Sequence, residues 1–331
     1  MTARQPFPRN VREFHAMFPD ERACFEYVVA SRWPGGSFSC PKCGNGDAYK
    51  RKGSLVLECT KCRALTSATA GTAMHRSKMP LSAWLLTAWL LVTDKRGISS
   101  VQLADQLSTR QETAYMMLQK LRAAMVAPDR TLLAGVVEVD ESFITTIPDK
   151  PLVAGAVEVR GDGRKTWLGR IRLRRIHSRE AEELLRFVIE NVDESSTIVT
   201  DAHASYGDLP LAGYRRKVES TARGLPQSDV LRHYHLAISN LKTYLAGTYH
   251  GAVGAKHIQA YLNEYAFRFN RRNNLPAAFQ RLLGIASEVE GPEYDEIYAA
   301  ETSAEAWVHP NPKRIEERIP LLAAHNRRRG R

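Results

Sequence analysis

The spacing of hydrophobic and polar positions changes along the chain and predicts five successive segments. Hydrophobic residues recur every three or four positions in two of them, as in helices, and β-rich runs alternate with helical patterns in another. The predicted segments are an N-terminal helical segment (1–36), a segment of paired cysteines among short polar turns (37–70), a helical segment (71–130), an α/β segment (131–285) and a polar, basic tail (286–331).

Two β-rich runs of the α/β segment end in an aspartate. Val136–Val139 leads into Asp140 and Thr197–Thr200 leads into Asp201, with two strands and a helix predicted between them. This order of elements matches a ribonuclease-H-like sheet, in which the first and fourth strands are neighbours. The two carboxylates would then lie together and repel each other, and such hard oxygen ligands suit Mg²⁺ or Mn²⁺. The alternative is that each aspartate only ends a strand at a turn.

Four of the five cysteines form two close pairs. Cys40 and Cys43 make one C-x2-C pair, Cys59 and Cys62 make the other, and about 15 residues separate the pairs. This spacing predicts a zinc ribbon whose four thiolates bind one Zn²⁺, with free buried cysteines as the alternative. Because four thiolates leave no open coordination position, the zinc is expected to be structural.

A helix-turn-helix is predicted within the helical segment. Ser99 or Ser100 can cap a short helix, and Thr109 with Glu112 matches a capping box at the start of the next one. Two helices joined by a tight turn suit insertion into the DNA major groove, and a plain helical bundle is the alternative. The candidates for DNA contact on the second helix are Arg110, Gln111, Lys120 and Arg122.

The charge of the chain favours an anionic partner. Its 47 Lys and Arg against 36 Asp and Glu give a net charge of +11, and a globular protein this basic usually binds a polyanion, nucleic acid above all. The most apolar run, Leu81–Val92, is too short to cross a bilayer, and the N-terminus lacks the apolar core of a signal peptide. We therefore expect an intracellular protein that has no membrane partner.

Taken together, these motifs resemble those of the bacterial insertion-sequence transposases that carry an N-terminal zinc ribbon and a DDE-type catalytic domain. The resemblance covers about residues 20–275. Besides the cysteine pairs and the two aspartates, it includes the stretches Arg32–Pro34, Gly71–Thr72, Met79–Leu81, Gly97–Ser99, Val137–Glu141, Ile238–Lys242, Gly247–Gly251 and Phe267–Arg272. It implies a ribonuclease-H-like fold, DNA cleavage at the element ends and strand transfer into target DNA. It also implies two catalytic Mg²⁺ or Mn²⁺ ions and a structural Zn²⁺. The implied partners are double-stranded DNA, both the terminal inverted repeats and the target, and a second copy of the chain in a homodimer on the DNA. The implied location is the cytoplasm, at the bacterial nucleoid.

The resemblance also assigns roles to individual residues. Asp140 matches the first acid of the family and Asp201 the second, and the third position, seven residues before Lys242, is His235. Many relatives have glutamate there, and imidazole is a softer ligand that is less usual for Mg²⁺. His235 could bind Mn²⁺, contact the scissile phosphate, move a proton or only pack its helix, and Asn240 is the alternative third residue. Lys242 is expected to hold the DNA backbone near the cut.

Other polar residues are weaker candidates. Arg268, Arg271 and Arg272 are interleaved with phenylalanines at helical spacing and are expected to face DNA phosphates. His203 and Tyr206 follow the second aspartate closely and could line the cleft.

Two alternative functions stay open on the sequence. His235 in place of an acid favours a domesticated DNA-binding regulator, which binds through the ribbon and the helices but no longer cuts. A metal-dependent repair nuclease is the other alternative, and it would cut without joining and without a preference for element ends.

Overall fold

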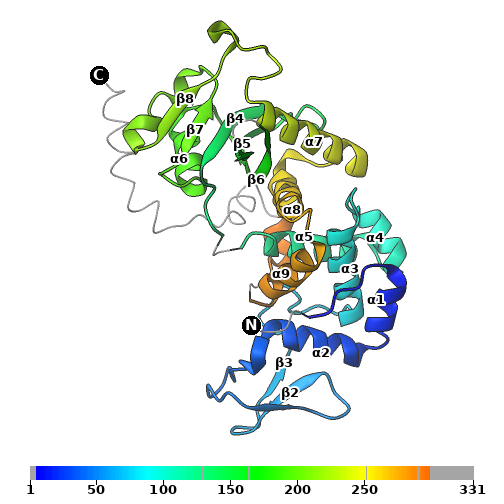
Figure 1. Cartoon of the computed structure of the whole chain (residues 1–331). Helices are drawn as coiled ribbons and strands as arrows, with labels where there is room; N and C mark the ends of the chain where they lie inside the picture. Colours follow the sequence, from blue (N-terminus) through cyan, green and yellow to red (C-terminus); the bar gives the residue numbers. More distant parts are fainter. Residues whose placement is uncertain (1–4, 128–129, 163–164, 251, 289–290, 299–331) are drawn as a thin grey trace. The chain divides into compact units, whose positions relative to one another are not determined.

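A computed structural model of the chain describes residues 5–127, 130–162, 165–250, 252–288 and 291–298. These residues form two compact units, one within Met1–Met125 and Arg271–Ala299 and the other within Val126–Asn270 (Figure 1). Residues 271–285, which the sequence pattern placed in the α/β segment, thus belong to the unit of the N-terminal elements. Most of the tail predicted at 286–331 lies outside the described residues.

The first unit is helical apart from a small antiparallel sheet. Among the described residues, none of the helices is long and apolar enough to cross a membrane. The helices are α1 (Val11–Met17), α2 (Glu21–Arg32), α3 (Leu81–Thr93), α4 (Ser100–Leu107), α5 (Gln111–Ala124), α9 (Leu275–Glu288) and α10 (Tyr294–Tyr298). The strands of the sheet, in spatial order, are β1 (Ala48–Lys50), β2 (Val56–Cys59) and β3 (Leu65–Ser67).

Of the two helix caps predicted for the helix-turn-helix, one forms and the other does not. Ser99 caps α4 through its side chain, as predicted, because its hydroxyl accepts a hydrogen bond from a backbone N–H of the first turn. The capping box predicted at Thr109 and Glu112 does not form. Helix α5 begins one residue too late for it, at Gln111, and its N-cap is Arg110, which makes no side-chain cap bond.

The start of α3 is capped by a residue of another helix. Its own N-cap residue, Pro80, has no side chain that could accept a hydrogen bond. The carboxylate of Glu21 in α2 instead accepts hydrogen bonds from the backbone N–H groups of Leu81 (2.8 Å) and Ser82 (2.9 Å). A negative charge at this position also interacts favourably with the helix dipole.

The second unit is built on one mixed sheet of five strands. Its spatial order is β6-β5-β4-β7-β8, with β4 antiparallel to β5 and parallel to β7. The first and fourth strands of the unit are therefore neighbours, as the sequence predicted, and this arrangement is compatible with a ribonuclease-H-like fold. The strands are β4 (Val136–Phe143), β5 (Leu152–Gly161), β6 (Thr166–Ile176), β7 (Thr197–Thr200) and β8 (Arg215–Val218).

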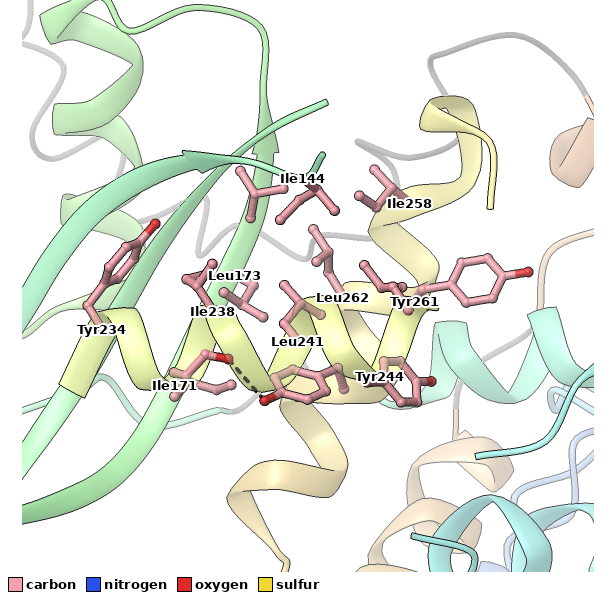
Figure 2. Packing of buried hydrophobic residues seen from close by; sticks show 14 of the residues in the cluster. Ile144, Ile171, Leu173, Tyr234, Ile238, Leu241, Tyr244, Ile258, Tyr261 and Leu262 are labelled. Atoms are coloured by element: carbon pink, nitrogen blue, oxygen red, sulfur yellow. Dashed lines mark hydrogen bonds between the residues drawn. The ribbon is translucent and has the colours of Figure 1, made fainter. Parts of the chain in front are cut away.

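Helices cover both faces of this sheet. On one face α6 (Ala181–Asn191) packs against alternate strand residues, Val137 and Val139 among them. On the other face, α7 (Arg232–Tyr249) and α8 (Ile258–Asn270) form a second core with β5 and β6 (Figures 1 and 2). Because side chains alternate between the two faces of a strand, β5, β6 and β7 each contribute residues to both cores.

Side-chain amides of α8 cover the main chain of the edge strand β6. The Gln259 side chain accepts a hydrogen bond from the N–H of Arg175 (2.8 Å) and donates one to the carbonyl of Leu173 (3.3 Å). The Asn270 side chain accepts from the N–H of Ile171 (2.7 Å) and donates to its carbonyl (3.1 Å). These bonds satisfy polar groups that an open edge strand would leave unpaired.

We expect Asn270→Ala to destabilise the second unit. The substitution leaves both main-chain groups of Ile171 without their side-chain partner, and an unpaired buried donor or acceptor costs about 1–3 kcal/mol. Urea unfolding measures the loss, and Asn273→Ala, an exposed asparagine beyond the end of α8, is the control. An equal loss in both variants would contradict this account of the strand edge.

Candidate active site and zinc centre

Each cysteine pair lies in a tight backbone turn. In the first pair, the carbonyl of Cys40 accepts a hydrogen bond from the N–H of Gly44 (2.8 Å), and the N–H of Cys40 donates to the carbonyl of Asn45 (2.9 Å). The second pair repeats the turn, with a bond of 3.1 Å from the N–H of Arg63 to the carbonyl of Cys59. The residue after each pair has a positive φ, 70° at Gly44 and 58° at Arg63, so the arginine adopts a conformation that favours glycine.

The four sulfur atoms fit a single zinc ion. All four Sγ atoms lie within 4.8 Å of one another, with 3.6 Å between those of Cys40 and Cys62 and 3.6 Å between those of Cys43 and Cys59. Tetrahedral Zn–S bonds of about 2.3 Å would place the sulfurs about 3.8 Å apart. Backbone N–H groups, that of Cys62 first, lower the pKa of Cys59 to about 6, which favours the thiolate that binds zinc.

Asp140 lies within β4, which continues for three residues beyond the predicted end to Phe143, and Asp201 directly follows the last residue of the parallel strand β7. The register of β4 and β7 pairs Glu138 with Val199, and each aspartate lies two residues further along the chain, so the two lie opposite each other. Burial, and after it the charges of Glu141 and Asp201, raise the pKa of Asp140 to about 7, although an N–H bond from Glu141 to its Oδ1 (2.8 Å) favours the carboxylate. Two carboxylates that repel each other in this way are a donor set that fits Mg²⁺ or Mn²⁺.

The loop that carries Asp201 is held by an arginine of the neighbouring strand. Arg216 in β8 donates to the backbone carbonyl of Asp201 (3.0 Å) and to the Thr200 hydroxyl (3.0 Å). The carboxylate itself accepts a hydrogen bond from the N–H of His203 (2.9 Å). The position of Asp201 is therefore fixed from both its backbone and its side chain.

His235 and Lys242 lie on one side of α7, two turns apart. Burial lowers the pKa of His235, Lys242 lowers it further, and the charges of Glu138 and Asp201 act in the opposite direction. The imidazole is therefore neutral at pH 7 and lies within the electrostatic reach of the carboxylates. Asn240 lies about 140° around the helix from His235, so the two side chains do not point the same way.

Within the described parts of the chain, the four cysteines are the one group of three or more His, Cys, Asp or Glu residues whose donor atoms lie close enough together to hold a metal ion.

Two family models match the chain. An ISXO2-like transposase domain matches residues 132–270, and a transposase zinc-ribbon domain matches residues 19–64. Both domains are those of an insertion-sequence transposase. No curated protein matches the chain significantly. The longer match ends at Asn270, where the second unit ends, and contains both aspartates, His235 and Lys242.

Glu141 and Tyr206 of the transposase pair with each other away from the aspartates. Glu141 follows Asp140 in β4 and points to the opposite face, where it accepts a hydrogen bond from the Tyr206 hydroxyl (2.5 Å) and pairs with Arg179 (3.3 Å). Tyr206 was expected to line the cleft, but it is buried in the core beside α6. Its neighbour His203 is exposed.

The DNA-contact candidates on α5 differ in exposure. Arg110 and Gln111 are exposed at the start of the helix. Lys120 is half-buried, and its ammonium group donates to the carbonyl of His75 (3.3 Å). Arg122 is only 1% exposed, so the expectation that it faces DNA is wrong. The pattern of polar positions could not reveal this, because it treats every charged residue as a surface residue.

The arginines near the end of α8 need a similar correction. Arg268 pairs with Glu264, one turn earlier (3.2 Å), and the two side chains are 12% and 0% exposed. Its guanidinium also lies over the ring of Tyr244, 5.5 Å from the centroid, so Arg268 does not face phosphates. Arg271 is half-buried, and burial followed by the charge of Arg281 lowers its pKa to about 10.

Arg272, two residues beyond the end of α8, is exposed. It is thus the one arginine of this group whose surface position agrees with the expected contact to DNA. That contact itself stays a prediction.

Sequence reasoning missed Glu138 and Arg216 at the site of the transposase. Glu138 lies two residues before Asp140 in a strand, so the alternation of strand side chains places both on the same face. That signal was available in the sequence. The bonds of Arg216 depend on the pairing of β7 with β8, which the residue pattern does not specify.

We expect Asp140→Asn to stabilise the protein at pH 8 in metal-free buffer. The folded-state pKa of about 7 is above the unfolded value of 3.8, so this group lowers the free energy of unfolding progressively as the pH rises from about 4 to about 7, and the full loss is present at pH 8. Removing that charge is expected to raise the free energy of unfolding by about 2–4 kcal/mol at pH 8, and the gain disappears as the pH falls toward 4. Urea unfolding at both pH values measures it. A gain of equal size at pH 4 would contradict the proposed cause.

Proposed function

We propose that this transposase cleaves DNA at the ends of an insertion sequence and joins the freed 3′ ends to target DNA. The observation that carries the proposal is the parallel register of β4 and β7, because it brings Asp140 beside Asp201. The transposase-domain match over residues 132–270 supports the same reaction class.

The residues of the second unit divide the chemistry among them. Asp140 and Asp201 would hold two divalent ions, which when bound polarise the phosphodiester and stabilise the attacking and leaving oxygens of an in-line displacement. His235, neutral at pH 7, can accept a proton or a ligand bond through its free nitrogen. Lys242, on the same side of α7, is suited to hold a phosphate of the cut strand.

Two displacements at this site account for transposition. In the first, the 3′-side oxygen of the phosphodiester leaves as water attacks phosphorus, which frees a 3′-OH at the element end. In the second, that 3′-OH attacks a phosphodiester of the target, and one bond forms as another breaks. The phosphate passes directly between oxygens, so the chain needs no nucleophilic side chain.

DNA recognition is assigned to the first unit. The zinc ribbon carries the basic residues Lys42, Lys50, Arg51, Lys52, Lys61 and Arg63. We propose that the ribbon and the exposed start of α5, with Arg110 and Gln111, bind the terminal inverted repeats. Cutting and joining two ends together calls for two protomers on the DNA, so the active species is expected to be a homodimer.

One observation favours a second function. The third position carries His235 in place of the usual acid, and imidazole is a less usual partner for Mg²⁺ than a carboxylate. A regulator that binds element ends without cutting them would tolerate this arrangement.

Incubation with labelled element ends and target DNA separates the two functions. We expect cleaved and joined products with Mn²⁺, fewer with Mg²⁺, and none with chelator. Binding without products under all these conditions would favour the regulator. Cleavage without joining would favour a nuclease.

A further inference from the structure

Helix α7 begins without a capping side chain of its own. Its N-cap residue, Leu231, has a left-handed backbone conformation (φ 45°, ψ 44°) and makes no side-chain cap bond. Two glutamates from elsewhere in the unit accept hydrogen bonds from backbone N–H groups at this helix start. Glu138 of β4 accepts from the N–H of Tyr234 (2.7 Å), and Glu219 accepts from the N–H of Leu231 (3.3 Å).

Glu138 uses both of its carboxylate oxygens on this helix. While Oε2 accepts the bond from Tyr234, Oε1 lies 2.7 Å from Nδ1 of His233. The residue is 5% exposed, so its charge is stabilised mainly by these two partners and by the dipole of α7. Because Glu138 lies two residues before Asp140, the strand that carries the first aspartate also holds the start of the helix that carries His235.

Tyr234 fits closely against the same part of the sheet. The side chain is fully buried, and its hydroxyl donates to the hydroxyl of Ser142 (3.0 Å) in β4. Gly155, which pairs with Asp140 across the strands, leaves the space for the ring, since a Cβ there would lie 2.8 Å from the ring's Cε2. Figure 2 shows Tyr234 at the start of α7, packed against the strands. The first turn of α7 is thus fixed at points directly around Asp140.

We propose that Glu138 is a positioning residue that sets the distance between His235 and the two aspartates. The inference rests on the proposed function and adds a residue to it. His235 directly follows Tyr234, so a shift of the first turn moves the imidazole relative to Asp140. Displacements of about 1 Å at a reacting centre can cost about 100-fold in rate.

Two substitutions at Glu138 separate positioning from charge. Glu138→Ala removes both bonds, and we expect the single-turnover cleavage rate to fall about 100-fold while the affinity for element ends is unchanged. Glu138→Gln keeps the shape. Its amide oxygen can accept from Tyr234 and its amide nitrogen can donate to Nδ1 of His233, so we expect a rate within about 10-fold of the wild type. Equal losses in both variants, or no loss in Glu138→Ala, would overturn the proposal.

Glu219→Ala is the matched control at the same helix terminus. It removes the other glutamate that contacts the start of α7, but Glu219 lies outside the strand of Asp140. We expect a much smaller loss of rate than in Glu138→Ala. A loss as large as that of Glu138→Ala would mean that any weakening of the cap suffices and would overturn the specific role of Glu138.

Gly155→Ala tests the same positioning without changing a charged residue. The added methyl group pushes the Tyr234 ring away from the strand, so the rate is expected to fall with unchanged DNA affinity. If Glu138→Ala does not fold, Gly155→Ala and Glu138→Gln still test whether the first turn of α7 positions His235. A wild-type rate in Gly155→Ala, with hydrogen exchange showing a displaced first turn, would overturn the proposal.

Amide hydrogen exchange separates this inference from the proposed function. Faster exchange at Tyr234 and His235 in Glu138→Ala, with the rest of α7 unchanged, supports the contact whether or not the protein cuts DNA. Unchanged exchange there overturns it. A wild type that never cuts would overturn the proposed function alone, whereas a wild type and a Glu138→Ala variant that cut equally fast would overturn the positioning alone.

Discussion

Asp140→Asn and Asp201→Asn are each expected to lower the rate of DNA cleavage by at least about 1,000-fold. Each substitution removes one of two adjacent carboxylates while keeping the size of the side chain. Loss of the charge stabilisation that divalent ions give a phosphoryl transfer costs several kcal/mol, and each 1.4 kcal/mol is tenfold in rate. Single-turnover cleavage of a labelled element end, with Mn²⁺ in excess, measures the effect.

Binding and an unrelated aspartate serve as controls for this prediction. The affinity for the element end is expected to stay within a few-fold of the wild type, because recognition is assigned to the first unit. Asp105→Asn changes an exposed aspartate of α4 and should cut at the wild-type rate. If the variants at Asp140 and Asp201 process DNA as the wild type does, the catalytic proposal is wrong.

Removal of zinc is expected to unfold the ribbon and to abolish specific binding to element ends. The sheet of the ribbon has strands of only three, four and three residues, which cannot supply a stable core by themselves. Structural zinc sites contribute about 10–16 kcal/mol of apparent binding energy in small domains, so metal binding and folding are one event. Cys59→Ser, assayed by metal analysis and by DNA binding, measures the effect.

The fifth cysteine offers a matched control for the zinc prediction. Cys24 is buried in α2 and is not one of the four clustered cysteines, so Cys24→Ala should keep one zinc per chain and the wild-type affinity. A Cys59→Ser variant that contains no zinc but binds element ends as tightly as the wild type would remove the ribbon from DNA recognition.

The features that were predictable from the sequence depend on local patterns. The zinc site follows from the spacing of the two cysteine pairs, and the four sulfurs do lie within 4.8 Å of one another. The placement of Asp140 near Asp201 follows from strand order, since the first and fourth strands of the unit are parallel neighbours, although β4 continues beyond Asp140 to Phe143. In both cases, the spacing or order of a few residues determines how the side chains of the site are arranged.

The features that were missed depend on contacts between distant segments. Arg122 and Arg268 have the sequence pattern of exposed arginines, yet both are largely buried. The fully buried carboxylate of Glu264 stabilises Arg268 there. The sequence pattern of the helix would have placed Glu264 on the surface as well. The cap of α7 by Glu138 joins residues far apart in the chain, and no local helix-start signal indicates it.

The covered edge of β6 bears on how copies of this protein can associate. Gln259 and Asn270 already occupy main-chain groups of Ile171, Leu173 and Arg175 that an incoming strand would need, which hinders extension of the sheet along this part of β6. The opposite edge, β8, is four residues long and carries Arg215 and Lys217, whose like charges discourage strand addition. Both edges of the sheet are thereby made less open to strand addition by a neighbouring molecule.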